Sequence, residues 1–240
     1  IALNNLEQAK SKTLTGQDNE DKAPCFSKAP AEIYYEEDLP ESQKQIDTEF
    51  WKARLNKITN VFKNYADIES GTASIQFEVY RNYFVNTDGT EVVQNRRVAR
   101  VMLTASVMAP DGMTCPLNLD YLAYDLNEFP TEEKMIADAK DLVERLKALR
   151  TAPIADPYTG PAILSGPASG VFFHEIFGHR LEAHRMKSGG QTFKKMVGQK
   201  VLPETFSVYC DPTLQYFHNN ELNGYYKYDD EGVKAQRVMN

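Results

Sequence analysis

The feature that most constrains the fold is a change in the period of the apolar residues along the chain. Between residues 72 and 109, apolar side chains such as Phe77 and Val79 alternate with polar ones, which is typical of a strand with one solvated face. The Asn-Thr-Asp-Gly sequence at residues 86–89 predicts a hairpin turn in which glycine supplies a positive φ. The return strand then carries Val101, Leu103, Ala105 and Val107. These signals predict an antiparallel pair of strands.

Segments with the apolar period of a helix precede and follow the predicted pair of strands. Residues 45–65 repeat apolar side chains every three to four positions, and residues 132–150 do the same behind Thr131, a typical N-cap. Acidic residues begin the second helix and basic residues end it, as the helix dipole favours. A further strand is expected near residues 117–124. We therefore predict an α+β fold, an antiparallel sheet backed by helices.

The composition divides the chain into three parts. Residues 1–44 are predicted to be the end of a helix followed by a polar arm or linker, and residues 45–155 the N-terminal α+β domain. Prolines at positions 153 and 157 mark the boundary. Residues 156–240 are interpreted as the start of a β-rich C-terminal domain, in which 162–165 form a short strand before a helix.

That helix holds the chemistry of the chain. Three of the four histidines, His174, His179 and His184, lie in residues 166–190. Apolar residues recur there at helical spacing, Ser169 is a suitable N-cap, and two glycines at positions 189 and 190 are a strong stop. We predict one helix over about residues 170–187, carrying the pattern H-E-x-x-x-H.

Two imidazoles and an adjacent carboxylate are the side chains that a zinc-dependent hydrolase requires. Neutral imidazole nitrogens bind zinc, and a catalytic site needs three protein ligands with one position left for water. Zinc lowers the pKa of such a water to about 7. Glu175 directly follows His174 and is placed to take the proton from the water. The simpler interpretation is that these residues form only the polar face of an amphipathic helix.

The spacing of the histidines is unusual for a shared metal. Residues five apart differ by about 140° around a regular α-helix, whereas residues four apart differ by about 40°. His174 and His179 would therefore diverge. A π-bulge near Phe177 and Gly178 would return them to one side, and such bulges are frequent at functional sites. This hypothesis requires that the helix depart from regular α geometry between the two histidines.

Longer runs of sequence resemble a known family. The run YTGPAILSGPASGVFFHEIFGHRLEAHR at residues 158–185 is similar to the signature of the TldD/PmbA family of zinc metalloproteases, whose members are also known as modulators of DNA gyrase. Further similar runs follow in the family's order: GGQTFKKMVGQKV, SVYCDPTL and YDDEGVKAQR. Upstream, YRNYFVNTDGTEVVQ resembles the family's strand-turn-strand.

The resemblance implies roles for single residues. His174 and His179 would be zinc ligands and Glu175 the general base, while Glu182 would orient His179. His184 stands where the family usually has aspartate, so it is either a substitute ligand or a solvated neighbour of the site.

The family's third ligand is a cysteine near its C-terminus. Cys210 matches a different motif, so this ligand is expected beyond Asn240, and the chain is interpreted as an N-terminal fragment.

The function implied is a zinc-dependent peptidase that hydrolyses short or unfolded polypeptides. The alternative is a non-catalytic regulatory protein of the gyrase-modulator type, acting within a dimer of family members. A homo- or heterodimer is expected in either case, since the family forms dimers.

Composition narrows the range of partners. The net charge is −7 and the isoelectric point about 5.2, and no basic stripe is present, so nucleic-acid binding is not expected. No apolar run reaches the length of a membrane span. The three cysteines are far apart and predict no disulfide framework. The default location is the cytoplasm, and a signal peptide before Ile1 would make the protein an exported one.

Overall fold

The computed structural model describes residue 7, residues 28–182, residue 185, residues 193–218 and residues 220–239. The described residues form two compact units. The sheet unit contains residues 29–157 and 211–237. The histidine unit contains residues 7 and 28, the described residues of 158–210, and residues 238 and 239. The predicted helix end before residue 13 lies outside the described residues, apart from Glu7.

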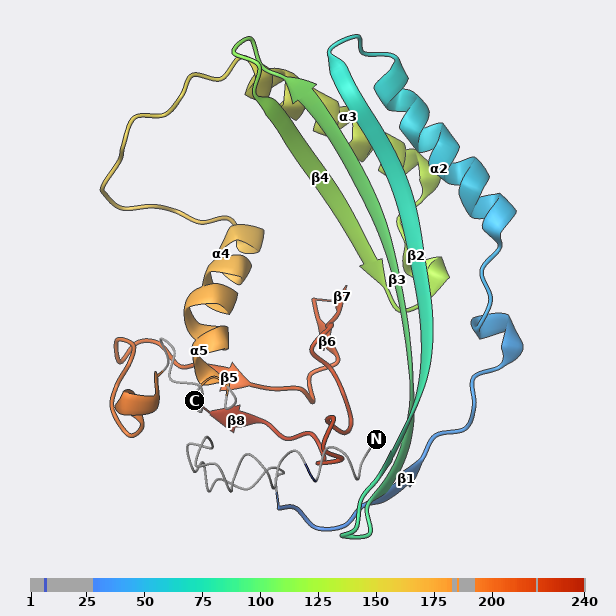
Figure 1. Cartoon of the computed structure of the whole chain (residues 1–240), viewed down its shortest axis with the longest axis vertical. Coiled ribbons are helices and arrows are strands. Elements are labelled where there is room, and N and C mark those ends of the chain that lie inside the picture. Colours follow the sequence, from blue (N-terminus) through green and yellow to red (C-terminus); the bar gives the residue numbers. More distant parts are fainter. Residues whose placement is uncertain (1–6, 8–27, 183–184, 186–192, 219, 240) are drawn as a thin grey trace. The chain divides into compact units, whose positions relative to one another are not determined.

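A long antiparallel hairpin forms the centre of the sheet unit (Figure 1). Strands β2 (Ile68–Val85) and β3 (Glu91–Met108) pair along their whole length, and Gly89 in the turn between them has φ 94°. The predicted hairpin is therefore confirmed, and its strands extend beyond the predicted apolar residues. The alternating burial of β3 gives this strand one face in the core.

Two further strands share the other edge of β3. Strand β4 (Thr114–Ala123) is antiparallel to residues 99–108, and the short strand β1 (Ile33–Tyr35) is parallel to residues 91–93. Strand β1 lies inside the segment that the sequence predicted as a polar arm. Its pairing is long-range, because it joins residues about sixty positions apart, and three residues carry too little periodicity to predict a strand.

Helices α2 (Thr48–Lys63) and α3 (Glu132–Arg150) cover one face of the sheet (Figure 1). Both predicted helices are confirmed. Each begins at a side-chain cap, since Asp47 accepts from the amide of Phe50 and Thr131 from the amide of Lys134. The core between helices and sheet is apolar and fully buried at its centre, with Ile58, Ala99, Val101, Leu103, Ala105, Val107, Met135, Ala139, Leu142, Val143 and Leu146 as its most enclosed members. The predicted α+β class is confirmed.

The turn end of the hairpin packs against the C-terminal segment of the same unit. The rings of Tyr34 and Tyr228 lie 5.1 Å apart, and Gln94 donates to the carbonyl of Tyr228. Gly232 has φ 71° and lies so close to Phe84 that a β-carbon there would be 2.4 Å from the ring. Residues 211–237 therefore pack in the sheet unit, while the domain boundary near residue 155 stays a prediction.

An ion pair joins this segment to the sheet. Lys227 donates to Glu36 and to the hydroxyl of Tyr34, and the amide of Asn95 donates to Glu36 over 2.6 Å. Burial alone would raise the pKa of Glu36, but the bonds from Lys227 and Asn95 lower it below its usual value. The side chain of Glu36 is 19% exposed, so the loss of Lys227 would leave a largely enclosed carboxylate.

We expect Lys227→Met to lower the free energy of unfolding by about 1 kcal/mol at neutral pH, because a hydrogen bond to a charged group is lost in a partly exposed setting. A carboxyl with a lowered pKa stabilises the fold above its unfolded pKa and stops doing so as pH falls through the folded value. The difference in the free energy of unfolding between variant and wild type should therefore become smaller at pH ~3.

Urea unfolding at the two pH values measures this difference. Lys57→Met, which removes the exposed partner of Glu132 in the same unit, is the matched control and should change stability less. If Lys227→Met lowered the free energy of unfolding equally at both pH values, the loss would not depend on the charge of Glu36, and the prediction would be wrong.

The histidine unit consists of a broken helix and short strands. Helix α4 (Gly166–Phe173) continues through a π-helical turn (His174–Gly178) into α5 (His179–Leu181). Strands β5 (Tyr209–Cys210) and β8 (Val238–Met239) pair with each other. In the sheet unit, β6 (Tyr216–Phe217) and β7 (Asn220–Glu221) form a second small pair.

Three local predictions for this unit were wrong. The helix begins at Gly166 instead of near residue 170, with Ser165 in place of Ser169 at the N-cap, because Pro167 fits the first turn, where no amide donor is needed. It is interrupted after Leu181, where Glu182 turns to an extended backbone with ψ 119°; Arg185 is helical, and the other residues of 183–187 lie outside the described part of the chain. Residues 162–165 form no strand.

Among the described residues, none of the helices combines the length and the apolar character that crossing a bilayer requires.

Candidate metal site

The π-helical turn determines where the two histidines point. The amide of His179 donates to the carbonyl of His174, five residues back, as well as to that of Phe177. The turn thus holds one residue more than a regular α-helical turn, which reduces the angular mismatch of a five-residue spacing. The predicted π-bulge is present, and it spans the whole interval between the histidines.

Local sequence favours this turn. Gly178 has no side chain to restrict the backbone, and a β-carbon there would meet only the carbonyl oxygen of Phe173, at 3.9 Å. Phe177 is the one buried residue of the turn, with 5% of its surface exposed. Its burial anchors one side of the turn, while the histidines lie on another.

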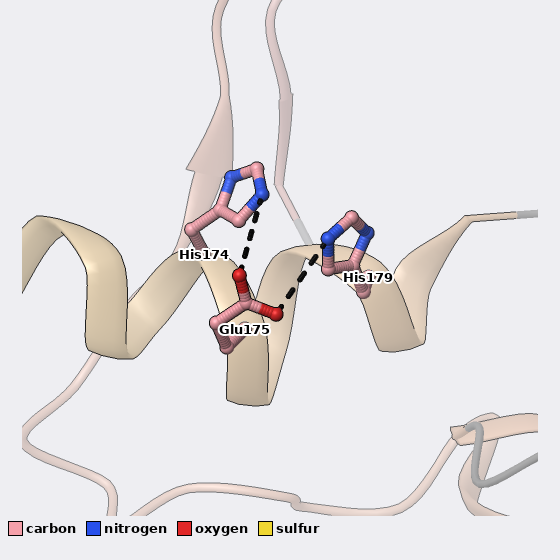
Figure 2. A group of neighbouring side chains, drawn as sticks. All are labelled: His174, Glu175 and His179. Atoms are coloured by element: carbon pink, nitrogen blue, oxygen red, sulfur yellow. Dashed lines mark ion pairs between the residues drawn. The ribbon is translucent and has the colours of Figure 1, made fainter.

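The imidazoles of His174 and His179 lie close together (Figure 2). Their ring centroids are 4.5 Å apart and the ring planes are inclined by 76°. The carboxylate of Glu175 sits beside both: one oxygen is 4.0 Å from Nε2 of His174 and the other is 3.7 Å from Nε2 of His179. The three residues therefore face a common point.

The donor set fits a divalent metal ion. One potential ligand atom from each of these residues lies within 4.8 Å of the other two. In a tetrahedral zinc site with bonds of ~2.0–2.1 Å, neighbouring nitrogens are about 3.3 Å apart. The imidazoles of His174 and His179 would have to move closer together to place their nitrogens at that distance. The side chains of His174 and Glu175 are 64% and 61% exposed, so a further ligand, a water or a substrate can reach the group.

The more enclosed histidine has a fixed partner. Nδ1 of His179, whose side chain is 27% exposed, lies 2.6 Å from a carboxylate oxygen of Glu182. This bond is the main cause of the lowered pKa of Glu182, to which Arg185 also contributes. The contact agrees in position with the orienting role that the family resemblance gave to Glu182. His184, the other predicted neighbour of the site, lies outside the described residues.

A groove of about 660 Å³ is lined in part by residues of the same helix. Its lining is mostly apolar: Phe173, Phe177, Gly178, Leu181, Glu182, Ser207, Val208, Tyr209 and Cys210. The sequence did not indicate that residues 207–210 lie beside the helix, because no local signal encodes a contact across about thirty residues. Cys210 lines the groove and is not a member of the histidine-glutamate group found among the described residues.

These features define a class: an α+β protein that carries a His-Glu-His group on a helix with a π-helical turn. Residues 157–239 match the model of the PmbA/TldA metallopeptidase C-terminal domain. A metalloprotease of Archaeoglobus fulgidus is 33% identical over 101 residues, which are 42% of this chain and 22% of that protein. One from Methanothermobacter thermautotrophicus is 26% identical over 84% of this chain and 41% of its own length.

Solved structures share the fold. A proposed modulator of DNA gyrase from Thermotoga maritima matches with a TM-score of 0.62 and 14% identity, over 97% of this chain and 51% of its own. TldE from Thermococcus kodakarensis matches with a TM-score of 0.56 and 18% identity, over 95% and 49%. Together these matches confirm the predicted resemblance of the chain to the TldD/PmbA family. The chain spans less than half the length of the curated relatives described above.

Proposed function

We propose that the protein is a zinc-dependent peptidase that hydrolyses short or unfolded polypeptides. The observation that supports this best is the π-helical turn, because it brings His174 and His179 to one side of the helix despite their five-residue spacing. A helix whose histidines served only as a solvated face would gain nothing from that departure from regular geometry. The metalloprotease names of the relatives agree with the proposal.

Each residue of the group has its own role. His174 and His179 would hold the metal, with Glu182 orienting the second ring. Zinc, when bound, supplies the Lewis acidity that makes water a nucleophile at neutral pH. Glu175 accepts the proton of the attacking water on one carboxylate oxygen and delivers it to the leaving amine. The third protein ligand is expected from a cysteine beyond Asn240, as the family resemblance implies.

The substrate would bind as an extended chain beside the helix. The groove is mostly apolar, and its lining includes Glu182, which contacts His179. It suits an apolar side chain of a flexible polypeptide, and a folded protein would not present a segment to it. A homo- or heterodimer of family members is part of the same proposal.

A second candidate is a regulatory protein without catalysis. It is favoured by the solved structures from Thermotoga maritima and Bacteroides thetaiotaomicron, which are described as proposed modulators of DNA gyrase. Metal analysis of the full-length protein separates the candidates: about one zinc per chain supports the peptidase, and no stoichiometric metal supports the regulatory role.

Cleavage of an unstructured polypeptide, followed by mass spectrometry, tests the activity directly. We expect cleavage that stops when a chelator removes the metal and returns when zinc is added back. Cleavage that persists in the metal-free protein would rule out the zinc mechanism.

A further inference from the structure

A continuous polar contact links three side chains beside the candidate metal site: His179, Glu182 and Arg185. Nδ1 of His179 lies 2.6 Å from Oε1 of Glu182, and Nε of Arg185 donates to Oε2 of the same carboxylate over 2.5 Å. The two oxygens of Glu182 are therefore divided between an imidazole and a guanidinium. A carboxylate held on both oxygens keeps one orientation, whereas one held on a single oxygen can turn about its broad terminal torsion.

The backbone returns Arg185 to this position. Helix α5 ends at Leu181, and Glu182 has an extended conformation with φ −61° and ψ 119°. The amide of Arg185 then donates to the carbonyl of Glu182 over 3.1 Å. Backbone and side chain of Arg185 thus both bond to Glu182, so the contact does not depend on a long side chain alone.

The orientation of Glu182 matters because imidazole has two nitrogens. When Nδ1 donates its proton to a carboxylate, the lone pair of Nε2 is left for a metal ion. In this structure Nε2 of His179 faces Glu175, at 3.7 Å, on the side where the proposed metal would bind. If Glu182 turned away, His179 could rotate, or exchange its proton between the two nitrogens, and would offer a poorer ligand.

We propose that Arg185 is a positioning residue of the metal site: it holds Glu182, which in turn holds His179 ready for the cation. The inference depends on the proposed zinc function of His174 and His179. The competing interpretation is a surface ion pair, since the side chains of Arg185 and Glu182 are 47% and 33% exposed. An ion pair of that kind would leave metal affinity unchanged.

Zinc affinity of the full-length protein, measured by competition with a chromophoric chelator, tests the proposal. Loss of a residue that supports a ligand typically weakens metal binding about 10–100-fold, which we expect for Glu182→Gln. Arg185→Met acts one contact further away and should weaken binding about 3–10-fold. Arg185→Lys keeps the charge but not the forked donor, and should be intermediate. Lys200→Met, which breaks an exposed ion pair with Glu204 in the same unit, is the matched control.

The double variant Glu182→Gln/Arg185→Met tests whether Arg185 affects metal binding through Glu182. If Arg185 acts through Glu182, its substitution has no further effect once Glu182 has been replaced. The visible spectrum of the cobalt-loaded protein supplies a second readout, because it reports ligand geometry, and it should change in Arg185→Met but not in Lys200→Met.

The outcomes separate this inference from the proposed function. If the wild-type protein binds no zinc, both fail. If it binds zinc and Arg185→Met binds as tightly as wild type, only the positioning role fails. Equal losses for Arg185→Met in the wild-type and Glu182→Gln backgrounds would show that Arg185 acts by another route, and would overturn it as well.

Discussion

Glu175→Ala is expected to abolish peptide cleavage while zinc remains bound. Each oxygen of this carboxylate lies near Nε2 of one histidine, at 4.0 and 3.7 Å, so the group is within reach of a water held between the imidazoles. General bases in such positions contribute about 10²–10⁴-fold to the rate. We expect kcat to fall by that factor and the zinc content to stay at the wild-type value.

The same geometry allows a different role for Glu175, as a metal ligand, because it belongs to the group of potential ligand atoms within 4.8 Å. The two roles differ in what the variant retains. A base is lost without loss of metal, whereas removal of a ligand weakens zinc binding as well. Glu175→Gln, which keeps the size and loses the basicity, should be as inactive as Glu175→Ala. Glu204→Ala, at an exposed position of the same unit, should keep full activity. Wild-type turnover in Glu175→Ala would remove this residue from the mechanism.

Sequence predicted the parts of the fold that local signals encode. The hairpin turn at residues 86–89 and the helix behind Thr131 follow from turn chemistry, capping and period, and both are confirmed. Strand β1 was missed because its pairing with β3 is non-local, and a strand of three residues has no measurable period. The interruption after Leu181 was missed because the glycine stop lies eight residues further on, while the backbone already becomes extended at Glu182.

The part of the candidate site that could be predicted is the helix between the two histidines, because their spacing limits how their side chains can be directed. A five-residue interval between histidines with a glycine inside it leaves two outcomes: the rings diverge, or the helix gains a residue. In the structure the helix gains a residue, and the amide of His179 donates to the carbonyl of His174. No sequence pattern indicated the contact between Arg185 and Glu182 or the groove formed with residues 207–210, and the groove depends on packing between distant segments.

The largest expected effect on metal binding is that of the histidines themselves. His174→Ala and His179→Ala should each weaken zinc binding by more than the ~100-fold that supporting residues contribute, because each removes one of the two imidazoles that the described residues bring to the site. Isothermal titration with zinc measures the loss. Thermal unfolding gives an independent readout, since a ligand that binds only the native state adds about 4 kcal/mol of stability at a thousand times its Kd.

The fourth histidine provides the matched control. His218 lies in the sheet unit and has φ 48°, a conformation that asparagine tolerates better than alanine. His218→Asn should therefore bind zinc as the wild-type protein does and keep the zinc-dependent rise in melting temperature. The two site variants should lose that rise while their metal-free melting temperatures stay near wild type, because both imidazoles are partly exposed.

The pair of site variants also tests the π-helical turn. If the turn exists to bring both rings to one cation, the two single losses should be similar in size, and the double variant should lose little more than either, because one remaining imidazole cannot hold the site. If only one histidine bound metal, its variant alone would lose zinc and the other would behave like His218→Asn. In that case the extra residue between His174 and His179 would have no metal to explain it, and the peptidase assignment would fail with it.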